Sequence, residues 1–106
     1  MRDTVLFHAA LADENRLRLL SLLGGGEVCV CQLQAVLRTN QPKISRHLAY
    51  LRKAGLVTAR EDGKWTHYRL KTPAGKPGKI LADILAALRK EPQIREDLRR
   101  LKKIGC

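Results

Sequence analysis

The chain has 106 residues, 44% of them hydrophobic, which suits one domain with a single core and leaves little room for a second. Its 21 basic and 10 acidic residues give a formal charge of +11, which attracts polyanions such as nucleic acid or an anionic membrane surface. No apolar run approaches the roughly 20 residues that span a bilayer, and the first residues lack a secretory signal. We therefore expect a cytoplasmic protein without membrane association, whose three cysteines stay reduced.

Two helices are predicted at the start of the chain. Residues 4–12 contain one apolar stripe at helical spacing. Asp13 then offers an N-cap for a second, leucine-rich helix. Gly24-Gly25-Gly26 should end it, because glycine tolerates the left-handed backbone of a helix C-terminus.

The next two predicted helices are short and have a tight turn between them. The first opens with Cys29-Val30-Cys31 and runs to Leu37. Residues 38–41 are polar and form the turn, while Pro42 fits the first position of the second helix. That helix should end at Ala54-Gly55.

A hairpin and further helices are predicted after it. Asp62-Gly63 lies between two runs rich in β-branched and aromatic residues, which is a strong hairpin signal. Residues 71–78 contain two prolines and should form a loop before a helical stripe from Ile80 to Leu88. Pro92 interrupts that stripe and precedes a last, basic helix. The fold class is mainly α with a β-hairpin, in the order of a winged helix-turn-helix domain.

The helix that begins at Pro42 has a face suited to DNA. Ile44, Leu48 and Leu51 fall on one inward stripe at about 100° per residue, and the opposite face is basic. Arginine there can pair bidentately with guanine. A merely solvated basic face is the alternative, and His47 is as well explained as a hydrogen-bonded boundary residue. We predict these DNA-binding residues: Gln41, Lys43, Ser45, Arg46, His47, Tyr50, Lys53, Arg60 and Lys64.

Three segments, EVCVCQL, NQPKISRHLAYLRKAGLV and GKWTHYRL, resemble the ArsR/SmtB family of bacterial metal-responsive repressors, most closely its arsenical-resistance members. The similarity covers residues 4–70 with specific motifs and residues 78–90 only in helical character. The resemblance implies a homodimeric winged-helix repressor that leaves double-stranded operator DNA on binding As(III) or Sb(III). It also implies one domain over residues 1–106 with dimer contacts on terminal helices, here the Val5 region and the stripe from Ile80 to Leu88.

Cys29 and Cys31 are the candidate metalloid ligands. Soft thiolates select soft ions, whereas carboxylates and water suit hard ones. Residues two apart on a helix point about 200° away from each other, so we expect shared ligation to unwind the helix start. A helix N-terminus is the cheapest part to distort and favours thiolates. The alternative is a pair of small buried hydrophobes.

The sequence leaves the identity of a third metalloid ligand open. Many arsenical repressors have a CVCxxC pattern, but Gln34 stands at the last cysteine position here. The third ligand of a trigonal site is then Cys106 from either subunit or a small thiol such as glutathione. The remaining alternative is that the site has no third ligand at all. Zinc sensors of the family that this sequence resembles bind zinc with Asp and His on the late helix. We expect this site to be absent here, because no histidine follows Asp83.

Other functions are compatible with the same sequence. A thiol-redox repressor would pair Cys106 with Cys29 or Cys31, since a bridge between cysteines only two apart is strained. A Cd(II)-responsive repressor would have incomplete ligation, and a constitutive DNA-binding protein would respond to no metalloid. We do not expect an enzyme, because His47 and His67 have no catalytic context and no phosphate loop is present.

Overall fold

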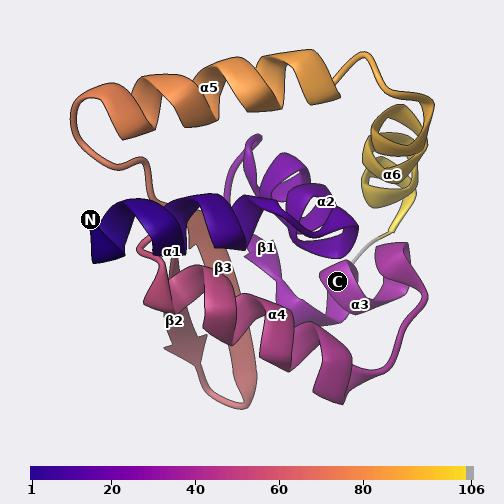
Figure 1. Ribbon diagram of the computed structural model, residues 1–106. Coiled ribbons are helices and arrows are strands. Elements are labelled where there is room, and N and C mark those ends of the chain that lie inside the picture. Colours follow the sequence, from indigo (N-terminus) through magenta and orange to yellow (C-terminus); the bar gives the residue numbers. More distant parts are fainter. Residues whose placement is uncertain (105–106) are drawn as a thin grey trace.

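The computed structural model describes residues 1–104, which form six helices and a three-stranded antiparallel sheet (Figure 1). The helices and strands are α1 (Arg2–Leu11), α2 (Glu14–Leu23), β1 (Val28–Cys29), α3 (Val30–Leu37), α4 (Gln41–Lys53), β2 (Val57–Asp62), β3 (Trp65–Leu70), α5 (Lys76–Leu88) and α6 (Pro92–Lys103). The predicted fold class and order of helices and hairpin are confirmed. No helix within this part of the chain is long and apolar enough to cross a membrane.

Local signals in the sequence set the ends of the first helices. The Asp13 carboxylate accepts a hydrogen bond from the Arg16 backbone N–H at 3.0 Å, which confirms the predicted N-cap of α2. Helix α2 ends before Gly24, whose backbone is still right-handed. Gly26 has the positive φ of 135° that turns the chain away.

The turn between α3 and α4 is one residue shorter than predicted, because α4 begins at Gln41 and Pro42 is its second residue. Arg38 closes α3 in the left-handed conformation with a φ of 53°. The Asn40 side chain then accepts a hydrogen bond from the Lys43 backbone N–H at 3.0 Å and caps α4. Ile44, Leu48 and Leu51 are 0% exposed, so the inward stripe of α4 is confirmed and its other face is fixed toward solvent.

Strand β1 was not predicted. Val28 pairs with Tyr68 and Cys29 pairs with His67, which gives the strand order β1-β3-β2. A two-residue strand has no periodicity of its own, and only a partner far along the chain makes it a strand. The segment that precedes α3 therefore belongs to the same sheet as the hairpin, which is the wing of the fold.

The loop after the hairpin is shorter than predicted. Helix α5 begins at Lys76, and Pro77 lies in its first turn, where its missing N–H would have no intrahelical partner. The prediction that residues 71–78 are all loop was therefore wrong for its last three residues. Pro92 likewise lies at the start of α6.

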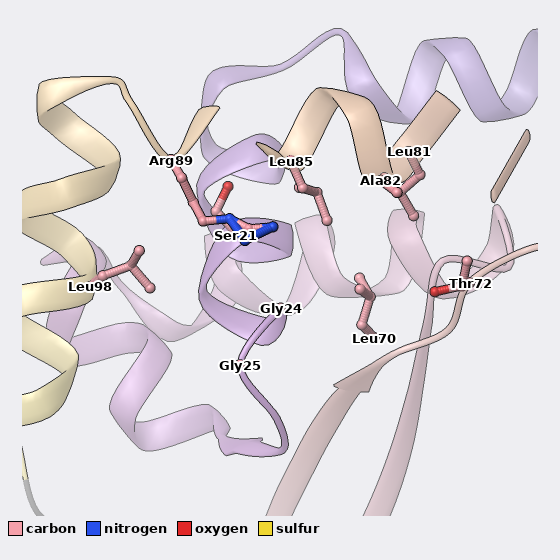
Figure 2. A pocket seen from close by; sticks show the side chains of 10 residues that line it. All are labelled: Ser21, Gly24, Gly25, Leu70, Thr72, Leu81, Ala82, Leu85, Arg89 and Leu98. Carbon is pink, nitrogen blue, oxygen red and sulfur yellow. The ribbon is translucent and has the colours of Figure 1, made fainter. Parts of the chain in front are cut away.

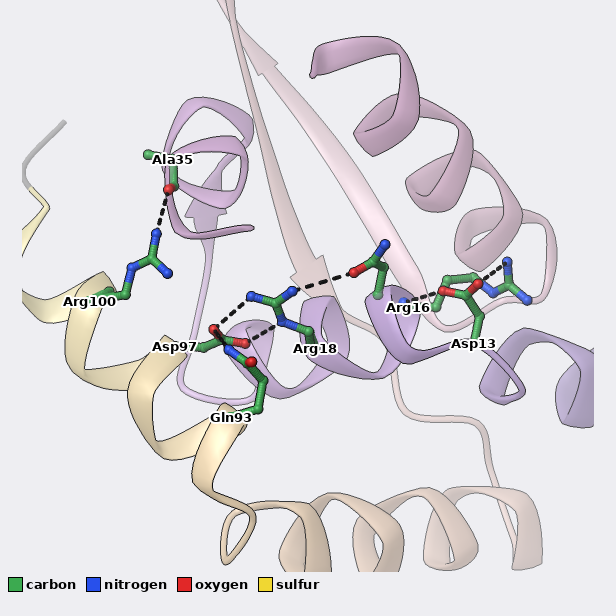
Figure 3. Close-up of polar contacts among 8 residues, drawn as sticks. Asp13, Arg16, Arg18, Ala35, Gln93, Asp97 and Arg100 are labelled. Carbon is green, nitrogen blue, oxygen red and sulfur yellow. Dashed lines mark hydrogen bonds and ion pairs between the residues drawn. The ribbon is translucent and has the colours of Figure 1, made fainter. Parts of the chain in front are cut away.

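Helix α6 is joined to α2 by a buried ion pair (Figure 3). The Arg18 guanidinium donates to both carboxylate oxygens of Asp97, at 2.7 and 2.9 Å, and Gln93 donates to the same carboxylate at 2.9 Å. Asp97 is 0% exposed. The hydrogen bond to Asp97 raises the pKa of Arg18 above its ordinary value, although burial opposes this. Arg100 also donates to the Ala35 carbonyl at 3.2 Å, which ties α6 to α3.

Candidate thiolate site and nucleic-acid interface

The sulfur atoms of Cys29 and Cys31 lie together where β1 passes into α3. Their Sγ atoms are 2.9 Å apart. Cys29 is buried at 2% exposure and Cys31 is half-buried. Two soft donors therefore meet at one point at the edge of the core, within reach of a single soft ion.

The expectation that these two side chains diverge was wrong. Helix α3 begins at Val30, and Cys29 is its N-cap, with an extended backbone at φ −70° and ψ 144°. Only Cys31 has helical geometry, so the roughly 200° separation of two helical positions does not apply. The helix start does not have to unwind to bring the two sulfurs together.

Gln32 holds this end of α3 in place. Its side-chain oxygen accepts a hydrogen bond from the Cys29 backbone N–H at 3.1 Å, in a capping box with Cys29. Its side-chain nitrogen donates to the Ile104 carbonyl at 3.4 Å. The end of the described chain therefore lies against Gln32, the residue that follows Cys31.

No third metal ligand joins the two cysteines among residues 1–104, because no group of three His, Cys, Asp or Glu there could hold a metal ion. His67 is the cross-strand partner of Cys29, yet it forms no such group. Cys106, the third predicted ligand, lies outside the described residues.

The predicted DNA face of α4 is exposed as a continuous surface. Ile44, Leu48 and Leu51 point into the core, so the rest of the helix faces solvent. The exposed positions of α4 predicted to contact DNA are Gln41, Lys43, Ser45, Arg46, Tyr50 and Lys53. Neither Lys43 nor Arg46 nor Lys53 makes an ion pair with another described residue.

Arg16 connects this face to the N-terminal helices. Its guanidinium donates to the carbonyls of Ala9 and Ala10 at 2.9 and 2.8 Å, and its central carbon lies 4.2 Å from the centroid of the Tyr50 ring. The contact with Tyr50 is a cation–π interaction. Sequence reasoning missed Arg16, because its partners lie on two other helices.

The His47 side chain, another member of the predicted set, contacts residues of the N-terminal region. Its Nδ1 lies 3.5 Å from an Arg16 nitrogen and 3.9 Å from an Asp13 oxygen, and its side chain is 20% exposed. These contacts support the interpretation of His47 as a boundary residue. Asn15, which no sequence signal indicated, lines the same hollow of about 470 Å³ together with Arg16, Lys43, Arg46, His47 and Tyr50.

The two predicted wing residues differ in their surroundings. Arg60 donates to both carboxylate oxygens of Glu27, at 2.7 and 3.1 Å. This hydrogen bond lowers the pKa of Glu27 and raises that of Arg60. Lys64, at the tip, has its Nζ 5.5 Å from the centroid of the Trp65 ring and remains exposed. Sequence reasoning missed Glu27, which neutralises the charge of Arg60.

The family model described as "Bacterial regulatory protein, arsR family" matches residues 13–59, which contain the thiol segment and α4. The "Arsenical resistance operon repressor" of Escherichia coli strain K12 is 59% identical over 61 residues, which cover 57% of this chain and 52% of that protein. The chain spans about half the length of the first curated relatives it matches.

Solved structures extend the match to 85% of the chain. HlyU from Vibrio cholerae is 31% identical with a TM-score of 0.71, covering 85% of this chain and 92% of that one. A homodimeric winged helix-turn-helix DNA-binding domain from Mycobacterium bovis, titled "a possible ArsR-family transcriptional regulator", is 30% identical with a TM-score of 0.67. It covers 85% of this chain and 83% of that one. These relatives are transcriptional regulators and not enzymes. The chain thus belongs to the ArsR family of bacterial regulatory proteins.

Proposed function

We propose that this protein is a cytoplasmic repressor that binds operator DNA as a homodimer and releases it when As(III) or Sb(III) binds the thiolates of Cys29 and Cys31. The observation that carries the proposal is the 2.9 Å separation of their sulfur atoms at the start of α3. Thiolates are the protein ligands that soft ions prefer. Hard cations prefer oxygen ligands, which the two cysteine side chains do not provide.

The position of the thiols explains how binding would reach DNA. One tight turn connects α3 to α4. We propose that the exposed face of α4 reads the operator. A ligand shifts a two-state balance only through differential affinity, so moving operator occupancy from 99:1 to 1:99 takes about 5.5 kcal/mol. Bonds from two or three thiolates to a soft ion supply that preference if they form only in the DNA-free arrangement of α3.

The proposed dimer uses the terminal helices of the single domain. Val5 on α1 and Ile80 on α5 are 59% and 42% exposed, although both are large apolar residues. Burial of such residues against a second copy is favourable. The M. bovis domain is homodimeric, and a dimer of this protein would present two α4 helices to two half-sites of the operator.

Cys106 is the third ligand in this proposal, with glutathione as a substitute. The support is the hydrogen bond from Gln32 to the Ile104 carbonyl, which brings the end of the described chain to the start of α3. Cys106 follows Ile104 by two residues. We therefore favour ligation by the same subunit.

Titration of reduced protein on its upstream DNA tests the proposal, with As(III), Sb(III), Cd(II) and Zn(II) added in a mobility-shift assay. The wild type should release DNA with As(III) or Sb(III). The Cys29→Ser and Cys31→Ser variants should bind DNA but no longer respond, whereas Cys106→Ser should have a smaller effect that glutathione restores. Release of the Cys29→Ser, Cys31→Ser double variant by As(III) would show that this pair is not the sensor.

A thiol-redox response is the second candidate, because sulfurs 2.9 Å apart are close enough to be oxidised together, although a bridge between cysteines two apart is strained. Treating the DNA complex with diamide in the absence of metalloid distinguishes the two. Retention of DNA under diamide together with release by As(III) supports metalloid sensing, and the reverse pattern supports the redox function.

A further inference from the structure

A cavity of about 350 Å³ lies away from both sites, between α2, α5, α6 and the end of β3 (Figure 2). Most of its wall is aliphatic and comes from Leu70, Leu81, Leu85 and Leu98. The volume lies within the range of about 300–1,000 Å³ typical of small-molecule sites. Its wall is therefore suited to the apolar body of a small ligand.

Ser21 adds an unsatisfied polar group to this wall. The residue is 8% exposed, and its Oγ is buried without a hydrogen-bond partner among the described residues. A buried hydroxyl without a partner is costly and rare in proteins, so it calls for an explanation. Because this Oγ has almost no accessible surface even with the cavity empty, a ligand atom can become its partner only if the Ser21 side chain turns toward the cavity.

Arg89 adds a positive charge at the same cavity. It closes the C-terminal end of α5, is exposed, and takes part in no ion pair with another described residue. Ser21 and Arg89 both line the cavity, as do Leu81 and Leu70 (Figure 2). The cavity thus has a cationic, hydrogen-bonding part and an apolar part.

The cavity stays open in the proposed dimer. Leu81 and Leu85 are buried, so their side of α5 faces the core. At about 100° per residue, Ala82 and Arg89 fall on one flank of that direction, and the exposed Ile80 falls on the other. A partner that covers Ile80 leaves the flank of Ala82 and Arg89 accessible.

We infer that this cavity binds a small monocarboxylate with a compact apolar body, such as a medium-chain fatty acid. The carboxylate pairs with Arg89 and accepts a hydrogen bond from the Ser21 hydroxyl, while the hydrocarbon packs against the leucines. Because α2, α5 and α6 all contribute to the wall, the ligand also holds these helices together. The site shares no residue with the thiolate pair or with the α4 face.

Calorimetric titration with octanoate, octan-1-ol and octylamine tests this inference on the intact protein. Octanoate should bind saturably with one molecule per chain, octan-1-ol should bind more weakly, and octylamine should not bind. Octanoate should also raise the melting temperature, since a ligand that binds only the folded state stabilises it. Absence of saturable octanoate binding up to millimolar concentration would overturn the inference.

Three variants locate the site. Ser21→Ala should weaken octanoate binding about 2- to 10-fold, as expected for one lost hydrogen bond, without lowering the melting temperature. Arg89→Gln should weaken octanoate but not octan-1-ol, whereas Lys90→Gln, the matched change outside the cavity wall, should weaken neither. Ala82→Phe should abolish binding by filling the cavity. Unchanged affinity in Ala82→Phe would place octanoate elsewhere and contradict the inference.

The thiol variant separates this inference from the proposed function. The Cys29→Ser, Cys31→Ser double variant should bind octanoate with wild-type affinity, although it no longer responds to As(III). Loss of octanoate binding in this variant would contradict an independent site. If the double variant still binds octanoate, this result supports the cavity site, whatever As(III) does to the wild type. It does not bear on the proposed function.

Discussion

The joint between α2 and α6 and the surface formed by α4 and the wing use arginine in opposite ways. At the joint, Arg18 donates hydrogen bonds to both oxygens of a buried carboxylate. On α4, Arg46 is exposed and makes no ion pair with another described residue. A charge with a buried partner holds elements together, whereas a charge without one is available to a polyanion. The number of basic residues in a sequence does not separate these roles.

The wing lies between the two cases. Arg60 is exposed like Arg46 but is paired like Arg18, because Glu27 accepts both of its hydrogen bonds. Since the pair is open to solvent, water and salt weaken it. Arg60 therefore adds to the DNA-facing charge only when Glu27 releases it, and Lys64 is the wing residue that is available at once.

The largest effect is expected at the joint. Asp97→Ala should lower the free energy of unfolding by about 3 kcal/mol, near the low end for a broken buried pair, because the Arg18 side chain remains 14% exposed. Urea denaturation measures the loss. The matched control is Glu96→Ala, which removes the exposed partner of Arg99 and should cost much less. Equal losses in the two variants would show that burial gives the Arg18–Asp97 pair no special role.

The next effect concerns the DNA face. Arg46→Ala should cost roughly 1 to 3 kcal/mol of specific operator binding, since the arginine is placed for a base contact. Its unfolding free energy should stay close to that of the wild type. Mobility-shift titration gives the affinity, and Arg52→Ala, on the flank of α4 nearer the core, serves as the control. A variant with full operator affinity would remove Arg46 from the readout.

Salt dependence distinguishes the two wing residues. Lys64→Gln should reduce the slope of log K against log salt by about 0.9 and weaken all sequences alike, as expected for one lost phosphate contact. Arg60→Gln should leave the slope nearly unchanged, because Glu27 already neutralises Arg60. Glu27→Gln should steepen the slope by freeing Arg60. If Lys64→Gln has no effect on the slope, the hairpin tip does not touch DNA.

The smallest effect is a shift in one titration. The hydrogen bond and charge of Arg60 lower the pKa of Glu27, so the pair is intact above the ordinary glutamate pKa of about 4.3. It is lost as the pH falls through the lowered pKa of Glu27 in the folded protein. NMR titration of the side-chain carboxyl should give a midpoint below the ordinary value. Arg60→Gln should move that midpoint upward, and a midpoint that does not move would mean that the pair does not form in solution.

The sequence predicts what is local. Asp13 caps α2 through a backbone N–H group three residues away, and the stripe of Ile44, Leu48 and Leu51 follows from helical spacing. Such contacts depend only on residue types and short separations.

What the sequence did not predict depends on contacts between distant residues. The pairs Glu27–Arg60 and Arg18–Asp97 are 33 and 79 residues apart in the chain. Strand β1 exists only because β3 pairs with it, and this pairing gives Cys29 its extended backbone. The direction of the two sulfurs was therefore predicted wrongly for a reason that no local pattern contains.

The geometry at the start of α3 also gives a rule for designing soft-ion sensors. Cys29 is the extended N-cap of a helix and Cys31 is its second residue, and in this arrangement the two sulfurs lie 2.9 Å apart. A designer can place the same pair at other helix starts, provided that a strand or an equivalent contact fixes the N-cap in the extended conformation. Two cysteines grafted two positions apart within a helix would face away from each other, and such a helix would need a different geometry to hold the ion.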